Sequence, residues 1–131
     1  MVSKTEYIPG VCNIGPAEIR MRRRIGWLGL AATLVLLAIF LAFRIPSPWR
    51  FFLFLPASIG ATGFLQAAFH FCAGFGNRGL FNFGPEVGKT ESVEQADFRL
   101  KDRRKAGLIG LYSVLIGVAA ALAGVLVVPL L

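Results

Sequence analysis

Three side chains in this sequence have the chemistry to bind a metal ion or a cofactor: His70, Cys72 and Cys12. His70 is the single histidine, and the chain has two cysteines. Imidazole and thiolate groups are ligands of zinc, copper and iron, and one histidine can also be an axial ligand of a haem or a chlorin. Residues two apart point about 200° apart on a helix, so His70 and Cys72 converge only where the helix breaks. Gly74 and Gly76 permit such a break.

The alternative interpretation of the same residues is structural. His70 would then hydrogen-bond a backbone carbonyl, and Cys72 would pack as a small apolar group. The sequence offers no evident fourth ligand, and it contains no phosphate-binding loop, nucleophile elbow or HExxH motif. We therefore expect no catalytic residue and no cofactor, with a metal or a tetrapyrrole as the alternative and the identity of any metal unknown.

His70 also ends a polar stripe within an otherwise apolar segment. Ser58, Thr62, Gln66 and His70 follow one another at steps of four, which places them on one face of a helix. Polar side chains in a membrane helix are costly and face a partner group. The stripe is typical either of hydrogen bonds that hold neighbouring helices together or of a water path or ligand groove. We favour packing.

Three uncharged runs have the length of a membrane span. They cover residues 25–43, 51–77 and 106–131, which is 19, 27 and 26 residues, and a spanning helix needs about 20. Charged residues make up 16% of the chain, whereas soluble domains average about 25%. The sequence predicts an all-α integral membrane bundle of three transmembrane helices in a single membrane domain, residues 1–131.

The basic residues predict how the chain crosses the membrane. Of its 14 lysines and arginines, 12 lie in residues 1–24 and 78–105, and the other two are Arg44 and Arg50. The positive-inside rule then places the N-terminus in the cytoplasm and the C-terminus outside. The net charge of +7 therefore indicates topology and attraction to anionic lipids, and not nucleic acid binding. Both cysteines fall on the reducing side, so we expect no disulfide.

Proline, glycine and capping residues predict where the helices begin and end. Pro16 and Pro48 suit the first turn of a helix, Ser92 with Gln95 resembles a capping box, and the glycines after Cys72 end the second helix. The expected elements are a cytoplasmic arm at 1–15, helix 16–43, an outer hairpin loop at 44–47, helix 48–74, a cytoplasmic Gly/Phe loop at 75–91, and helix 92–128.

Small and polar residues in the second and third spans predict close helix packing. The residues expected to pack are Ser58, Thr62, Gln66, Gly60, Gly63, Gly110, Ser113, Gly117, Ala121 and Gly124. Either another helix of this chain or a helix of another protein can fill the small-residue face of the third span. Basic and indole side chains at the ends of the runs predict anchoring at the membrane interface. The expected anchors are Arg22, Arg23, Arg24, Trp27, Trp49, Arg50, Arg103, Arg104 and Lys105.

Two blocks, YIPGVCNIGPAEI at 7–19 and FHFCAGFGNRGLFNFG at 69–84, resemble those of small, uncharacterised bacterial multi-helix inner-membrane proteins. The resemblance implies a multi-pass protein of the bacterial cytoplasmic membrane. It implies no activity, cofactor or catalytic residue.

The sequence thus favours a non-catalytic accessory or scaffolding subunit of a larger membrane complex. Its partners would be the lipid bilayer and other membrane-protein subunits or further copies of itself, without nucleic acid. Two alternatives remain open. One is a metal-, haem- or chlorin-binding redox protein that uses His70 with Cys72 and Cys12, and the other is a small oligomeric transporter or channel lined by the polar stripe.

Overall fold

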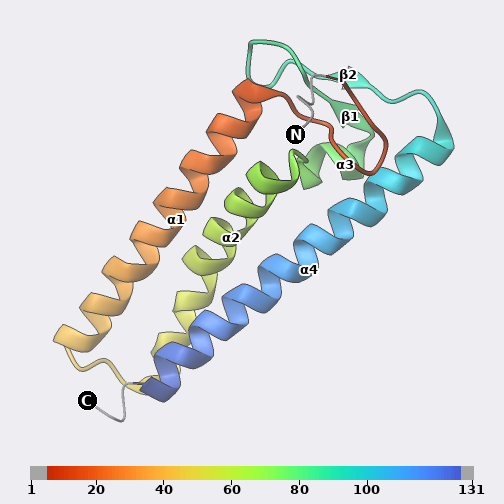
Figure 1. Ribbon diagram of the computed structural model, residues 1–131. Helices are drawn as coiled ribbons and strands as arrows, with labels where there is room; N and C mark the ends of the chain where they lie inside the picture. Colours follow the sequence, from red (N-terminus) through yellow and green to blue (C-terminus); the bar gives the residue numbers. More distant parts are fainter. Residues whose placement is uncertain (1–5, 128–131) are drawn as a thin grey trace.

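Three long helices lie side by side in a computed structural model of the chain, and the short segments near the N-terminus and between the second and third long helices gather at one end of them (Figure 1). The structure describes residues 6–127, and the side chains of Ser47 and Val127 are outside the description. Helices account for 72% of the chain. The elements are α1 (Pro16–Ala42), the 3-10 helix η1 (Ser47–Leu53), α2 (Phe54–Phe69), α3 (Ala73–Arg78), β1 (Leu80–Phe81), β2 (Glu91–Ser92) and α4 (Ala96–Val127).

Three helical segments are long and apolar enough to cross a membrane: Pro16–Ala42, Pro48–Phe69 and Ala96–Leu126. This confirms the predicted all-α class with three candidate spans. The direction in which the chain crosses the membrane stays a prediction. The large apolar side chains on the outer faces of α1 and α4 are exposed, as expected of surfaces that face lipid.

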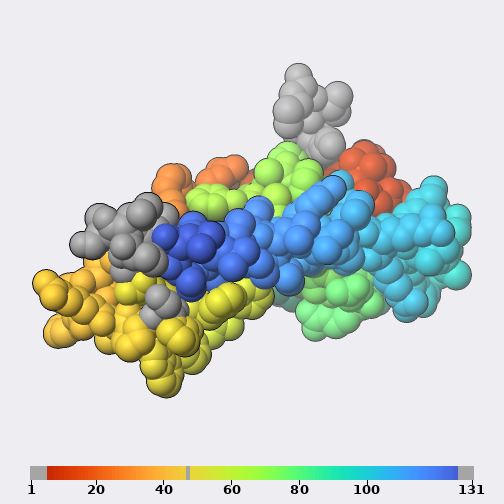
Figure 2. All heavy atoms as spheres, turned by 90° about the horizontal axis from the view of Figure 1, so that it is seen from below, coloured from red at the N-terminus to blue at the C-terminus, as the bar shows by residue number. Residues whose placement is uncertain are grey.

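The three spans form a layer with α2 in the middle. Helix α2 packs extensively against both α1 and α4, whereas α1 and α4 have few direct contacts with each other. Figure 2, which looks along a different direction, shows an elongated molecule with the N-terminal arm and the start of α4 at one end and η1 at the other.

Glycines allow α1 and α2 to approach until their backbones touch. Gly29 lies against Gly60, and Gly63 lies against Gly26. Because no Cβ atom separates the two helices at these points, the main chains pack at the close distance typical of small-residue motifs in membranes. Trp27 and Phe64 flank the crossing with their ring centroids 5.2 Å apart and their rings nearly perpendicular.

One end of the layer carries a folded cap made of the arm (residues 6–15), α3, β1, β2 and the loop between the strands. The two strands pair antiparallel, with Leu80 opposite Ser92 and Phe81 opposite Glu91. The cap has two apolar centres. Ile14, Cys72 and Phe75 form the first, and Phe71, Ala106 and Ile109 form the second, where the cap joins α4.

The predicted element boundaries differ from the structure at several points. The predicted helix 16–43 corresponds to α1, which ends one residue earlier. The predicted helix 48–74 is divided into η1, α2 and the beginning of α3, because His70 adopts a left-handed conformation with φ of 54° and ends α2. The predicted loop 75–91 contains most of α3 and the strand β1.

The third predicted helix also starts later than expected. It was placed at 92–128, whereas α4 begins at Ala96. Ser92 pairs with Leu80 in the small sheet, so its backbone is extended and it does not cap the helix. Residue 128 lies outside the described residues.

Candidate functional site

A layer of buried polar side chains joins the cap to the spans. Seven members are fully buried or nearly so: Asn13, Glu18, Arg22, Gln66, Cys72, Asn82 and Asp102. Asn13 belongs to the arm, Glu18 and Arg22 to α1, Gln66 to α2 and Asp102 to α4. Cys72 directly precedes α3, and Asn82 directly follows β1. Because buried polar groups without partners are destabilising, the way these groups pair determines how the cap is held.

Asn13 fastens the arm to the break between α2 and α3. Its side-chain amide donates to the Cys72 carbonyl at 3.1 Å, and its amide oxygen accepts from the Cys72 N–H at 2.6 Å. The Asn13 N–H donates to the His70 carbonyl at 3.1 Å. The left-handed turn at His70 brings these carbonyls to the arm, so three backbone groups at the break have partners.

A buried ion pair lies directly beneath this junction. One guanidinium nitrogen of Arg22 is 3.2 Å from Glu18 Oε1 and 3.0 Å from Cys72 Sγ. The other carboxylate oxygen, Oε2, accepts from Asn82 Nδ2 at 2.9 Å and from the Gly88 N–H at 2.7 Å. Glu18 therefore connects α1 to the loop between the strands, and Arg22 connects α1 to α3.

Asp102 of α4 holds the arm from the other side. Its carboxylate accepts from the Tyr7 hydroxyl at 2.6 Å and from the Gly10 N–H at 2.8 Å. The Tyr7 ring stacks on Phe81 with centroids 4.8 Å apart. Burial, followed by the hydrogen bond to Asp102 and the charges of Asp102 and Asp97, raises the pKa of Tyr7 well above its ordinary value.

The structure shows hydrogen bonds of the Cys72 and Cys12 thiols and of the His70 backbone, and the role of these residues as ligands stays a prediction. Cys72 contacts Arg22 and, as the N-cap of α3, accepts from the Phe75 N–H at 3.5 Å. The Cys12 thiol donates to the Glu6 carbonyl at 3.2 Å, and the His70 carbonyl accepts from the arm. Within residues 6–127, no group of three or more His, Cys, Asp or Glu side chains could hold a metal ion.

The polar stripe divides into separate roles. Thr62 donates to the Ser58 carbonyl of its own helix at 2.8 Å, and the Gln66 side chain accepts from the Ala73 N–H at 2.8 Å. Ser58 faces Gly117 of α4. Neither bond joins two spans, so the expected hydrogen bonds between neighbouring spans are not formed by Thr62 or Gln66, and Ser58 contributes its contact with α4.

The small residues of α4 mostly face α2 and η1. Gly117 packs against Ser58 and Phe54, and Gly124 packs against Leu53. Ser113 is buried and donates to the Ile109 carbonyl at 2.8 Å, and Ala121 is fully buried. The sequence left open whether this face packs against a helix of the same chain or of another protein. In the structure, helices of the same chain occupy it. Gly110 was expected to pack too, but it faces open space.

Two of the expected interface anchors are interior residues. Arg22 is part of the buried ion pair, and Arg50 is buried at the opposite end of the spans, where its Nε and one terminal nitrogen have no hydrogen-bond partner among the described residues. Lys105 is half-buried, with its ammonium 4.4 Å from the centre of the Phe69 ring. The remaining anchors are exposed: Arg23, Arg24, Trp27, Trp49, Arg103 and Arg104.

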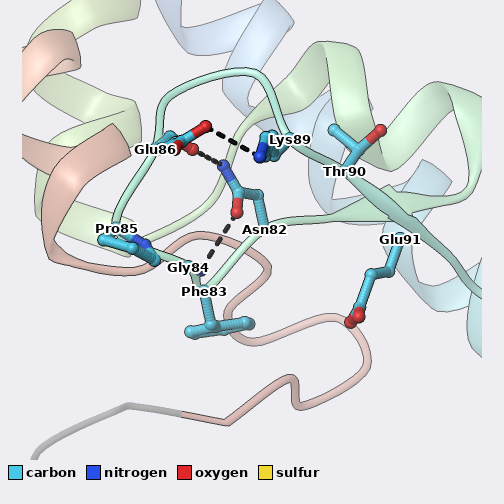
Figure 3. A pocket seen from close by; sticks show the side chains of 8 residues that line it. All are labelled: Asn82, Phe83, Gly84, Pro85, Glu86, Lys89, Thr90 and Glu91. Atoms are coloured by element: carbon cyan, nitrogen blue, oxygen red, sulfur yellow. Dashed lines mark hydrogen bonds and ion pairs between the residues drawn. The ribbon is translucent and has the colours of Figure 1, made fainter.

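The loop between the strands encloses a hollow of about 500 Å³. Figure 3 shows residues 82–91 curling around Asn82, whose amide group points to the backbone of Gly84 and Glu86. Glu86 and Lys89 form an exposed ion pair at 3.0 Å across the rim. The hydrogen bonds from Asn82 and Gly88 to the Glu18 carboxylate hold the loop against α1. We assign no ligand to the hollow.

Sequence reasoning missed the acids and two of the amides of the polar layer, together with the tyrosine that contacts one of the acids: Asn13, Glu18, Asn82, Asp102 and Tyr7. One signal was available. Glu18, Arg22, Gly26 and Gly29 follow at steps of four, four and three, which places them on one helix face. An arginine on the same face as two packing glycines points inward, whereas its neighbours Arg20, Arg23 and Arg24 point outward.

The three long apolar helices indicate a helical membrane protein, and a folded cap lies on one end of them. No family model, curated protein or solved structure matches the chain. The resemblance to small bacterial membrane proteins therefore stays a prediction.

The Tyr7–Asp102 contact gives a pH-dependent prediction. Because the pKa of Tyr7 is raised in the folded protein, its contribution to stability is complete below the ordinary tyrosine pKa of about 10 and is lost as the pH rises above it. We expect the difference in thermal stability between the wild type and Tyr7→Phe, about 1–2 kcal/mol at pH 7, to shrink between pH 9 and 11.

Thermal unfolding in detergent, followed by near-ultraviolet circular dichroism, measures this difference. Tyr7→Phe keeps the ring that stacks on Phe81 and removes only the hydroxyl, and lysine titration is common to both proteins. A difference that stays constant up to pH 11 would contradict the assignment.

Proposed function

We propose that this chain is a non-catalytic accessory or scaffolding subunit of the bacterial cytoplasmic membrane that packs against a helix of another membrane protein. The observation that carries the proposal is an apolar groove over α2, open on one side of the three-helix layer. The capped end would face the cytoplasm, in keeping with the excess of basic residues there.

The groove has a volume of about 420 Å³ and exists because α1 and α4 flank α2 without closing over it. Its floor consists of α2 residues that are mostly small, and its walls come from α1 and α4. The lining residues are Leu30, Thr33, Ala57, Gly60, Ala61, Phe64, Leu65, Ala68, Ile116 and Ala120. Small residues along a floor allow a second helix to approach closely.

The groove offers shape without polar chemistry. Thr33 is its one residue with a side-chain hydroxyl, and that group donates to the Gly29 carbonyl of its own helix at 2.7 Å. A partner helix with small residues on one face suits such a surface, because packing rather than hydrogen bonding would drive association.

The polar layer supports a non-catalytic role. Glu18, Asn82 and Asp102 accept or donate hydrogen bonds that attach the cap to the spans. Arg22 neutralises Glu18. Of these side chains, the Glu18 and Asp102 carboxylates have the most obvious potential for acid–base chemistry, and their hydrogen bonds supply a structural reason for each.

The test is to fill the groove. Ala61→Leu with Ala68→Leu replaces two methyl groups on its floor by isobutyl groups, and we expect co-purification of the partner from native membranes to fall at least about tenfold, because overpacking costs on the order of 1–3 kcal/mol. Quantitative mass spectrometry of the purified complex measures the loss. Ala32→Leu with Ala119→Leu is the matched control, since both alanines are exposed on α1 and α4.

Each outcome decides the proposal. Loss of one defined membrane protein with the groove variant but not with the control supports it. If native mass spectrometry finds only phospholipid, or a second copy of this chain, bound to the protein, that molecule and not another membrane protein occupies the groove. Equal recovery of all bound proteins with both variants would refute docking at the groove.

A further inference from the structure

The first turns of α4 carry a run of charges, Lys-Asp-Arg-Arg-Lys at 101–105, whose single acid is turned inward. Asp102 is fully buried and its carboxylate is occupied by Tyr7 and Gly10. Lys101, Arg103 and Arg104 are exposed. The surface of this run therefore presents cations with no acid between them, although the sequence places one acid among four bases.

Three of these cations line a pocket of about 370 Å³ between the arm and α4. Its lining is Pro9, Gly10, Lys101, Arg104, Lys105 and Leu108. The four α4 residues follow at steps of three, one and three, so they share one helix face. Among the ion pairs within residues 6–127, none involves Lys101, Arg104 or Lys105.

The pocket lies where the charged part of α4 meets its uncharged part, which is where lipid headgroups are expected. Lys105 is the last charged residue before the uncharged span of α4, and Leu108, one turn further on, is exposed at the start of that span. Pro9 adds a second apolar wall. A ligand seated here would meet three cations at one end and apolar surface at the other, which is the polarity of a phospholipid.

We propose that this pocket binds the phosphate of an anionic phospholipid headgroup, with Lys101, Arg104 and Lys105 as the phosphate-binding residues and Leu108 against the adjoining acyl region. Basic pockets beside transmembrane helices recognise anionic headgroups in this way. The buried Asp102 is the positioning residue, because its bonds to Tyr7 and Gly10 hold the arm that forms the second wall. The inference is independent of docking at the α2 groove, which lies on other residues.

Native mass spectrometry of the full-length protein in detergent tests this inference with two lipids of identical acyl chains, phosphatidylglycerol and phosphatidylcholine. The test variants are Lys101→Gln with Arg104→Gln, and the same pair with Lys105→Gln. The double variant keeps the Lys105 contact with Phe69. The matched control is Arg20→Gln, Arg23→Gln and Arg24→Gln, which removes three exposed charges from α1 at the same end of the molecule.

We expect the wild type and the control to prefer phosphatidylglycerol, and binding of that lipid to fall about fivefold for each cation removed from the pocket. Binding of phosphatidylcholine should not change. An equal loss in the control would show that the attraction is diffuse and would overturn the pocket. Displacement of phosphatidylglycerol by millimolar inorganic phosphate would overturn the lipid as ligand in favour of free phosphate.

Discussion

Replacing Gly29 by alanine should separate α1 from α2, although the change adds one methyl group. A Cβ atom on Gly29 would lie 2.5 Å from the Gly60 nitrogen and 2.9 Å from the Pro56 carbonyl oxygen. Both contacts are with backbone, which cannot move aside as a flexible side chain can. We expect a loss of at least about 1–3 kcal/mol of stability, the usual cost of overpacking, despite the better helix propensity of alanine.

A graded series of glycine variants provides the measurement. Gly60→Ala would meet its nearest atom at 3.1 Å, so it should cost less than Gly29→Ala, and Gly107→Ala meets nothing within 4 Å. Unfolding in a titration with sodium dodecyl sulfate can be followed by the fluorescence of Trp27, which packs on Phe64 across the same helix pair. Equal stabilities of Gly29→Ala and Gly107→Ala would contradict the crossing seen here.

The three spans could be predicted from the sequence because their signal is local. A run of 19 or more uncharged residues predicts a membrane-spanning helix, because backbone N–H and C=O groups in lipid must form their hydrogen bonds within the helix. Which helix faces pack against each other was harder to predict from the sequence. Gly60 and Gly63 were identified, whereas their partners Gly26 and Gly29 lie in a segment whose leucines and tryptophan dominate the pattern.

The break in the second span was expected from glycines but occurs at His70. A histidine in the left-handed region is unusual, and here a segment distant in the sequence holds the turn, since the His70 carbonyl accepts from the Asn13 N–H of the arm. Sequence patterns that span only a few residues cannot predict a contact between segments far apart in the sequence. The same limit concealed the arm, which reads as irregular because its hydrogen bonds go to other segments.

The candidate site was located only in part. The two blocks that carry the family resemblance, 7–19 and 69–84, are the segments that interlock in the cap through Asn13, Cys72 and Asn82. The alternative role of His70 and the cysteines as ligands stays a prediction, while amides and a carboxylate suggest a solvated surface. Burial reverses that expectation: the amides and the carboxylate are the residues that complete the network.

The ion pair of Glu18 and Arg22 should be the most sensitive point of that network. Glu18→Ala leaves the guanidinium of Arg22 without its countercharge in a position where the side chain is 9% exposed, and it removes the carboxylate that accepts from both Asn82 and Gly88. Removing one partner of a buried ion pair costs about 3–5 kcal/mol. We expect the cap to open while the three spans remain inserted.

Labelling of Cys72 by a maleimide reports this opening, because its thiol is buried and contacts Arg22. In a Cys12→Ser background, we expect labelling at least about a hundredfold faster in Glu18→Ala than in the parent, since the open state would gain that much population. Exposed Glu86→Ala, which breaks the rim ion pair with Lys89, is the control and should change the rate little.

The double variant Glu18→Ala with Arg22→Met separates charge from contact. Replacement of both charges by neutral side chains removes the unpaired guanidinium, so labelling should be slower than in Glu18→Ala alone and the two substitutions should be non-additive. Strict additivity would mean that Glu18 and Arg22 act independently, and then the ion pair could not be what joins α1 to the cap. Non-additivity, with Trp27 fluorescence unchanged, would place the coupling in the cap and leave the crossing of α1 and α2 intact.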